Sequence, residues 1–572
     1  MLSSMQVNNE ECAEAIYSED YVALLVDYVG SIEEIVQRFQ PICYQILTVQ
    51  QAIIYVSLPN QQALAEAGFN YRNIPKCFGL LDTSALEETG VLRLRRQPYL
   101  DLYGQGVLIG FIDTGIEYTH PVFVNADNTT RILSIWDQTI RTGEPPEGLL
   151  YGTEYSRTQI NQALASDNPL DVVPSTDTNG HGTFMAGTAA GNILERDDFS
   201  GIATSADIVV VKLKTAKQKI RDYFLVNDNP DCYTEDDIMS GIRYMVDVSS
   251  KVKKPIVICI GVGSNSGDHN GNSPLCKLIN FLGSFNGTVF SVAGGNEGNR
   301  GHHYESRLVP QGAMEEVEIN VGEGDKGFSM ELWADTLGIF SIGMVSPSGQ
   351  IIERIQPRIG KTETIRFLLE KTVATIEYYI IEPESGDELV VFRFLEPAQG
   401  VWKIRVYNDT VIQSRFNIWL PMEQLINQKT VFNQPEPNIT ICEPGNAAAS
   451  VTSSNYNHKT DSIYIYSSRG YTRGGLVKPT IASPGVDVFG PLLRGRFGTK
   501  TGSSVSASIT AGICALLLEW GIVLQNDLEL DSIEIQRYLI IGATRRELAY
   551  PNTEWGYGEI NIYNIFEQLR SS

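Results

Sequence analysis

Short apolar runs alternate with helical patterns along most of this chain. The β-branched runs GVLIGFID, ADIVVVKL, PIVICIGVG and GTVFSVAGG lie between about residues 85 and 307, and such runs are typical of buried parallel strands. The segments TFMAGTAAG and EDDIMSGIRYMVDVSSKV between them carry apolar positions at helical spacing. The same alternation returns after residue 436 and includes the apolar helix pattern SITAGICALLLEWGI. The pattern therefore predicts an α/β fold with a doubly wound parallel sheet.

The first part of the chain has a different pattern. YVALLVDYV predicts a strand, SIEEIVQRF a helix, YQILTVQQAIIYVSL further strands, and NQQALAEAGF a second helix. This order is typical of a small α+β domain. We therefore expect residues 1–84 to form a separable domain, which the proline-containing connector NIPKCFGLLDTSALEETGV joins to the rest.

Residues 308–435 interrupt the α/β pattern. Strand patterns such as MEEVEINV, FSMELWAD and GVWKIRVYN follow one another between turn signals, and helical patterns are few. This predicts an inserted β-sandwich of the jelly-roll type. Residues 85–307 and 436–572 would then be the two parts of one α/β domain.

Composition and charge indicate a soluble protein of several domains. The 572 residues are too many for one ordinary core, and the shares of 42% hydrophobic and 20% charged residues are those of globular proteins. The net charge of −24 argues against nucleic-acid binding. We find no uninterrupted apolar run of about 20 residues, the length that a membrane span needs, and no secretory signal at the N-terminus.

The eight cysteines are scattered and have no metal-binding spacing. Several lie inside apolar runs, as Cys259 does, so we interpret them as small buried side chains in a reducing compartment. Asp197 and Asp198 are interpreted as a solvated acidic turn rather than a cation site. These features favour residence inside a cell, and the sequence predicts neither a metal ion nor another cofactor.

Three motifs place polar residues where nucleophilic catalysis could use them. An apolar strand ends at Asp113 in GVLIGFIDTGIEYTHP, and a carboxylate there can orient an imidazole. His181 stands between two glycines at the start of a helix in DTNGHGTFMAGTAAG. Ser504 begins an apolar helix in TKTGSSVSASITAGICALL, where free N–H groups favour a developing oxyanion. Each motif alone also has a structural interpretation: a turn aspartate, a capping histidine and an N-cap serine.

A fourth motif, SVAGGNEGNRG, places Asn296 after an apolar strand, where its amide could donate to an oxyanion. The order Asp, His, Asn, Ser is far more specific than any single motif. With these motifs the chain resembles the subtilase (S8) family of serine proteases over about residues 95–305 and 436–570.

The resemblance implies a role for each matching residue. Asp113, His181 and Ser504 would form the catalytic triad, and the alignment of Gly502 favours Ser504 over Ser503 as the nucleophile. Asn296 would contribute to the oxyanion hole. The remaining matches imply a strand that pairs with substrate, Gly261, Val262 and Gly263, and one wall of the S1 pocket, Ala293, Gly294 and Gly295.

A narrower resemblance is carried by the connector, by TRILSIWDQTIRTGEPPEGLLYGTEYSRTQIN and by the late β-insert. These resemble the Csp subtilases of clostridia, a family associated with spore germination. The resemblance implies that the chain cuts its own propeptide around Leu80 to Ser84, keeps it bound, and activates the precursor of a cortex-lytic enzyme, either in the cytoplasm or associated with the spore. Two alternatives stay open: a pseudoprotease that binds a partner or a signal, and a general intracellular housekeeping protease.

Overall fold

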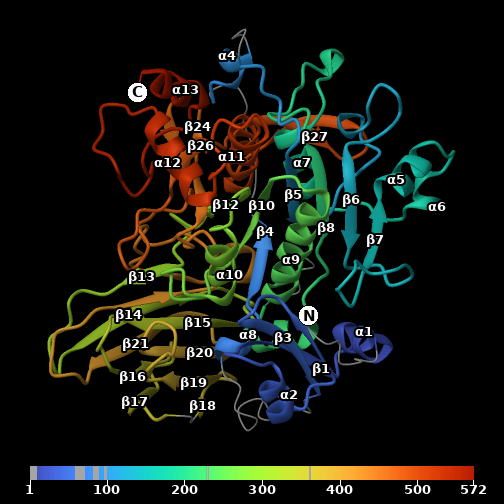
Figure 1. The fold of residues 1–572 in the computed structure, drawn as a ribbon. Coiled ribbons are helices and arrows are strands. Elements are labelled where there is room, and N and C mark those ends of the chain that lie inside the picture. The colour runs from blue at the N-terminus through green and yellow to red at the C-terminus, as the bar shows by residue number, and fades with distance from the viewer. Residues whose placement is uncertain are drawn as a thin grey trace.

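A nine-stranded sheet forms the centre of the computed structural model of this chain (Figure 1). The structure describes residues 9–57, 71–80, 89–95, 100–226, 229, 231–359 and 362–571. The strand order is β25-β24-β12-β10-β5-β8-β6-β7, with β26 beside β24. The strands are β5 (Leu108–Asp113), β6 (Ile132–Asp137), β7 (Thr153–Ser156), β8 (Asp207–Lys212), β10 (Ile256–Ile260), β12 (Thr288–Ala293), β24 (Ser450–Asn457), β25 (Ser462–Ile463) and β26 (Ile481–Pro484).

Most neighbours in this sheet are parallel, and only β7 and β25 run antiparallel to their partners. Helices α7 (His181–Ala190) and α11 (Ser503–Leu518) pack on one face, and α9 (Glu235–Val252) and α10 (Pro274–Leu282) lie on the other. All five residues of β10 are buried, as expected for a strand covered on both faces. The predicted α/β fold with a large parallel sheet is confirmed.

The remaining helices and strands of this domain lie at its periphery. They are α4 (Val91–Arg95), α5 (Arg157–Leu164), α6 (Pro169–Val172), α8 (Gln218–Phe224), α12 (Ser532–Gly542), α13 (Ile562–Ser571), β27 (Val488–Leu492) and β28 (Arg496–Lys500). In the described chain, the helical stretch Ser503–Val523 is long and apolar enough to cross a membrane, but 89% of its most apolar window is buried inside the protein. Its apolar character is therefore explained by packing in the core of the α/β domain.

Two antiparallel sheets pack face to face at one side of the α/β domain, and their strands lie between β12 and β24 along the chain. Their orders are β13-β22-β15-β20-β19-β18 and β17-β16-β21-β14-β23, and one apolar cluster lies between them. Alternate residues of β19 are buried, which is the pattern of a strand with one face on the core. The strands are β13 (His303–Glu305), β14 (Met314–Val321), β15 (Gly327–Ala334), β16 (Phe340–Val345), β17 (Ile351–Ile355), β18 (Thr362–Arg366), β19 (Val373–Tyr379), β20 (Leu389–Leu395), β21 (Gly400–Asn408), β22 (Phe416–Trp419) and β23 (Val431–Phe432).

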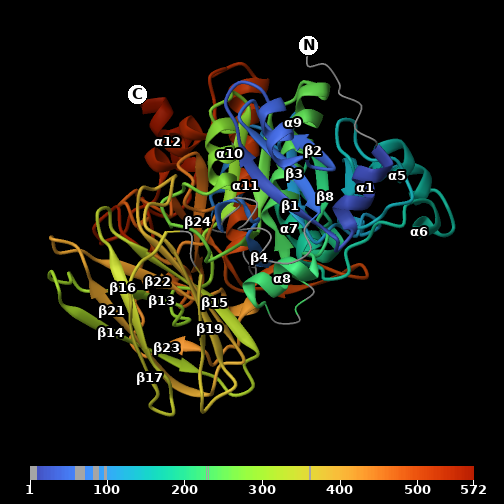
Figure 2. The same cartoon turned by 90° about the horizontal axis from the view of Figure 1, so that it is seen from below.

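The N-terminal residues form a three-stranded antiparallel sheet, β1-β3-β2, with helices α1 and α2. The elements are α1 (Asn9–Tyr17), β1 (Tyr21–Asp27), α2 (Glu33–Phe39), β2 (Cys43–Ile46) and β3 (Gln51–Ser57). The helix expected over residues 60–69 lies outside the described residues. Figure 2 shows this sheet against α9 and α10 of the α/β domain.

One expectation about the cysteines is wrong. A disulfide joins Cys12 of α1 to Cys43 of β2, although the scattered spacing suggested only reduced, buried thiols. The two cysteines are 31 positions apart, and they come together because α1 packs against the three-stranded sheet. The other six cysteines are buried and free, as expected.

Candidate active site

The carboxyl edge of the parallel sheet brings the three predicted catalytic side chains together. Asp113 is the last residue of β5 and is 1% exposed. Its Oδ1 accepts hydrogen bonds from Nδ1 of His181, at 2.7 Å, and from the backbone N–H of Thr114, at 2.7 Å. In sheets of this kind the carboxyl ends of the strands are where ligands bind, so the position fits a functional group.

His181 is the first residue of α7, and its ring bridges the other two groups. Nδ1 faces Asp113, and Nε2 lies 2.9 Å from Oγ of Ser504. The glycine that precedes it has φ of +88°, and a Cβ on Gly182 would lie 2.2 Å from the carbonyl oxygen of Gly115. Glycine on both sides of the histidine therefore allows the close approach of α7 to the end of β5.

Asp177 holds the turn that leads into His181. Its Oδ1 accepts from the backbone N–H groups of Asn179 and Gly180, and its Oδ2 accepts from the N–H of Thr183. This role of Asp177 was not predicted from the sequence. It could have been, because an aspartate shortly before a helix is a common capping residue.

Two adjacent serines begin α11, and the structure gives them different partners. Ser504 Oγ faces the imidazole of His181, whereas Ser503 Oγ accepts the backbone N–H of Gly295 at 3.1 Å. Both side chains are fully buried. Only Ser504 is therefore placed for proton transfer to the histidine, and Ser503 supports the strand end that carries Asn296.

Asn296 follows β12 beside the start of α11. Its Oδ1 accepts the backbone N–H of Ser503 at 3.1 Å, so its amide nitrogen is the end that remains for another acceptor. This orientation is compatible with the predicted role as an oxyanion donor, because a donor held in place before the reaction does not have to reorganise during it.

A strand from the N-terminal part lies between two short strands of the α/β domain, and we call this position between them the groove. β4 (Cys77–Leu80) pairs antiparallel with β11 (Val262–Gly263) on one side and with β9 (Tyr233–Thr234) on the other. Leu80 is opposite Val262, and Gly79 is opposite Gly263. Two of the three residues expected to pair with substrate thus pair with the chain's own segment.

The other predicted substrate-binding residues lie at the carboxyl ends of β10 and β12. A Cβ on Gly261 would be 3.1 Å from Oδ2 of Asp113. Ala293 is the buried last residue of β12, and the backbone N–H of Gly294 donates to Ser453. A Cβ on Gly295 would lie 2.4 Å from Sγ of Cys442, so glycine is required for this wall to close.

Burial shifts the pKa values of two other histidines and of one thiol. Burial lowers the pKa of His269 to about 3, and both of its ring nitrogens face backbone carbonyls. Burial also lowers the pKa of His303, whose ring lies between Glu436 and Asn417. Burial, reinforced by Asp113, raises the pKa of the Cys259 thiol, which therefore stays protonated and is a poor rival nucleophile.

Within the part of the chain that the structure describes, no group of three or more His, Cys, Asp or Glu side chains is arranged to hold a metal ion. The histidine of the site contacts a carboxylate and a hydroxyl instead. These two contacts can support proton transfer and nucleophilic attack.

Comparison with known proteins agrees with this geometry. Residues 104–558 match the subtilase family. The structure is similar to that of the Clostridium perfringens CspB protease, with a TM-score of 0.75 and 30% identity over 84% of this chain and 96% of that one. The chain is also 26% identical to thermitase of Thermoactinomyces vulgaris, over 35% of this chain and 51% of thermitase.

A further relative is the subtilisin-like protease SBT2.2 of Arabidopsis thaliana, 33% identical over 19% of this chain and 15% of that protein. The matched parts thus span about half of thermitase and a smaller share of the plant protein. Together the family match and the structural similarity confirm the resemblance that the four motifs indicated.

Proposed function

The chain belongs to the subtilase family of serine endopeptidases, and we propose that it hydrolyses peptide bonds with Asp113, His181 and Ser504 as its catalytic triad. The observation that carries this proposal is the continuous contact from carboxylate to imidazole to hydroxyl, with distances of 2.7 and 2.9 Å. The substrate is a protein or a peptide.

The chemistry follows from these contacts. His181 Nε2 takes the proton of Ser504 as Oγ attacks the peptide carbonyl, and Asp113 accepts the Nδ1–H and stabilises the imidazolium. The tetrahedral oxyanion receives hydrogen bonds from the Asn296 amide and the backbone N–H of Ser504. His181 then protonates the leaving amine, which leaves an acyl group on Ser504. Water, deprotonated by the same nitrogen, hydrolyses that ester and restores the serine.

The alternative function is that of a pseudoprotease, which binds a partner and does not catalyse hydrolysis. Such a protein would not need all three side chains in contact. The complete set, together with Asn296 beside the serine, supports catalysis instead.

We further propose that residues 1–84 are a propeptide that the chain cuts from itself and keeps bound, and that the β13–β23 insert is of the jelly-roll type. The position of β4 supports the first proposal, because a segment paired on both edges in the groove lies as a substrate would. Phe78, the second residue of β4, is 1% exposed. The expected cut falls at the end of β4 or in residues 81–84, and the latter lie outside the described residues.

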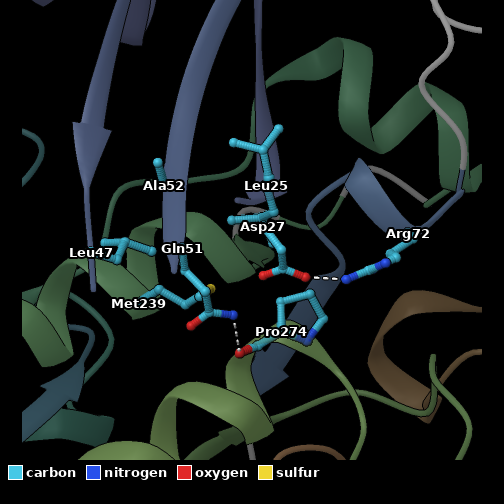
Figure 3. Close-up of a pocket in the computed structure, with 9 residues that line it drawn as sticks. Leu25, Asp27, Leu47, Gln51, Ala52, Arg72, Met239 and Pro274 are labelled. Atoms are coloured by element: carbon cyan, nitrogen blue, oxygen red, sulfur yellow. Dashed lines mark hydrogen bonds and ion pairs between the residues drawn. The ribbon is translucent and has the colours of Figure 1, made fainter. Parts of the chain in front are cut away.

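Retention is supported by the contacts between the N-terminal sheet and the α/β domain. Figure 3 shows part of this interface, where Gln51 Nε2 donates to the carbonyl of Pro274 at 3.3 Å. The cavity between the two surfaces there has a volume of only about 10 Å³, which indicates close packing. Two further bonds, Gln45 Nε2 to Ser240 Oγ at 3.0 Å and Arg243 Nη1 to the carbonyl of Ile46 at 2.9 Å, tie the sheet to α9. One cut peptide bond would leave all of these contacts in place.

Mass spectrometry of the purified protein tests self-processing. The wild-type chain should appear as two fragments that elute together from a size-exclusion column, and the larger should begin between residues 81 and 85. The Ser504→Ala chain should remain intact and elute at the same volume. A wild-type chain that stays uncut and yet hydrolyses added peptides would refute the propeptide assignment.

We also propose that the enzyme acts in spore germination, either in the cytoplasm or associated with the spore, by activating the precursor of a cortex-lytic enzyme. The support is the structural similarity to a clostridial Csp protease over 84% of this chain. Incubating that precursor with the wild-type enzyme should yield one defined cut, and the Ser504→Ala enzyme should yield none. Degradation at many sites would favour a housekeeping protease instead.

A further inference from the structure

A short segment of the β-insert lies over the groove that holds β4. We call this segment, residues 420–425, the strap; it includes the 3₁₀ turn Glu423–Leu425. Leu425 is 4% exposed, and the strap packs against β4. The insert therefore contributes to the groove itself and not only to the outside of the molecule.

Hydrogen bonds fix the strap on both sides of β4. On the β11 side, Asn265 donates to the carbonyl of Leu420 at 3.2 Å, and the N–H of Glu423 donates to Glu297 at 3.1 Å. On the β9 side, Asn229 donates to the carbonyl of Gln424 at 3.0 Å. The strap thus crosses β4 and is hydrogen-bonded to the segment after β11 and to the segment before β9.

The strap is also anchored next to the oxyanion residue. Glu297 directly follows Asn296 and is buried. Burial raises the pKa of its carboxyl group, but the ring of His302 at 2.6 Å and hydrogen bonds lower that pKa by more. The net shift of the pKa is downward. The carboxylate therefore stays ionised as it accepts the N–H of Glu423. An ion pair between Arg300 and Glu423, at 2.8 Å, adds a second attachment.

Two side chains of the strap face Gly79, the residue of β4 that is opposite Gly263. A Cβ built on Gly79 would lie 3.1 Å from Sδ of Met422 and 3.3 Å from Oε1 of Gln424. Both distances are shorter than ordinary contacts of a Cβ atom. Met422 is 1% exposed and belongs to the same buried cluster as Cys77 of β4, so it has little room to move aside.

The backbone of Gly79 does not itself require glycine. Its φ lies outside the left-handed region, so any residue could adopt its conformation. What excludes a side chain is the space that Met422 and Gln424 occupy. The Oε1 of Gln424 is buried, and no donor of the described residues reaches it, which makes this wall unfavourable for an apolar group.

We propose that Met422 and Gln424 are specificity-determining residues, which select glycine at the substrate position opposite Gly263. The proposal rests on the function proposed above, because it takes β4 as the bound form of a substrate. The insert then contacts the substrate residues on the acyl side of the scissile bond, while the α/β domain carries the catalytic residues.

Self-cleavage of the full chain tests the proposal. Each variant is synthesised in a cell-free system, and the cut fraction is followed with time on gels. Gly79→Ala should slow cleavage about tenfold and Gly79→Val about a hundredfold, because overpacking a filled site raises the energy of the bound strand. The pair Gly79→Ala with Met422→Ala should recover most of the rate that Gly79→Ala loses, and Met422→Ala alone is the reference for the pair.

Met344→Ala is the matched control, because Met344 is a fully buried methionine in the sandwich core on β16. It should not restore the rate of Gly79→Ala; if it does, general loosening explains the rescue and the proposal fails. Thermal melting of each variant in the Ser504→Ala background shows whether the uncut chain folds. A normal rate for Gly79→Val, or no rescue by Met422→Ala, would overturn the specificity role alone. A wild-type chain that never cuts would overturn the self-processing proposal, and the specificity role with it.

Discussion

Replacing Ser504 by alanine should lower kcat for a fluorogenic peptide by about a millionfold, the size of effect seen when a triad nucleophile is removed. The substitution deletes the hydroxyl that lies 2.9 Å from Nε2 of His181 and leaves the backbone of this residue in place. The thermal midpoint should therefore change little. A fluorophosphonate probe should label the wild-type protein at Ser504 once its cleft is accessible, and should not label the variant.

Ser503→Ala is the control for this experiment, since it removes an equally buried hydroxyl one residue away. Ser503 Oγ accepts the N–H of Gly295, next to Asn296, so its loss should weaken the oxyanion strand and lower kcat only modestly. Labelling at Ser503, or retention of self-cleavage in Ser504→Ala, would show that the assignment of the nucleophile is wrong.

Replacing Asp113 by asparagine should lower kcat by about ten-thousandfold while leaving KM nearly unchanged. An amide in this place can present a donor to the imidazole, so the ring loses the tautomer in which Nε2 accepts the serine proton. Stopped-time assays at saturating peptide would measure the change in kcat directly.

Asp137 offers a matched control for Asp113. It is also a fully buried aspartate at the end of a parallel strand, β6, but it bonds to Ser175 and Thr139 rather than to an imidazole. Asp137→Asn should therefore cost stability more than kcat. Equal losses of kcat in the two variants would mean that Asp113 stabilises the fold and does not orient the His181 imidazole.

The local features of this protein could be predicted from the sequence because each depends on neighbours along the chain. The apolar run that ends at Asp113, the small-residue helix after His181 and the apolar helix after Ser504 all lie where their patterns indicated. Their order along the chain was enough to indicate the family. The choice between Ser503 and Ser504 also followed from the motif, and the structure gives the two hydroxyls different partners.

Other features could not be predicted, because they depend on contacts between distant segments. The pairing of Cys12 with Cys43 and the turn that Asp177 holds were both missed. No pattern in the sequence places Met422 of the insert over Gly79 of the N-terminal part, since 343 positions separate them along the chain (422 − 79).

The sequence by itself determined the pattern of strands and helices and indicated the β-rich region and the residues proposed to react, because apolar periodicity and short motifs are local properties of a chain. Only the tertiary structure decided which surfaces meet: the strand β4 between β9 and β11, and the strap across it. These contacts depend on how the three parts of the molecule pack together. That packing is the sum of many weak contacts and hydrogen bonds over long chain separations, which leave no periodic signal in the sequence.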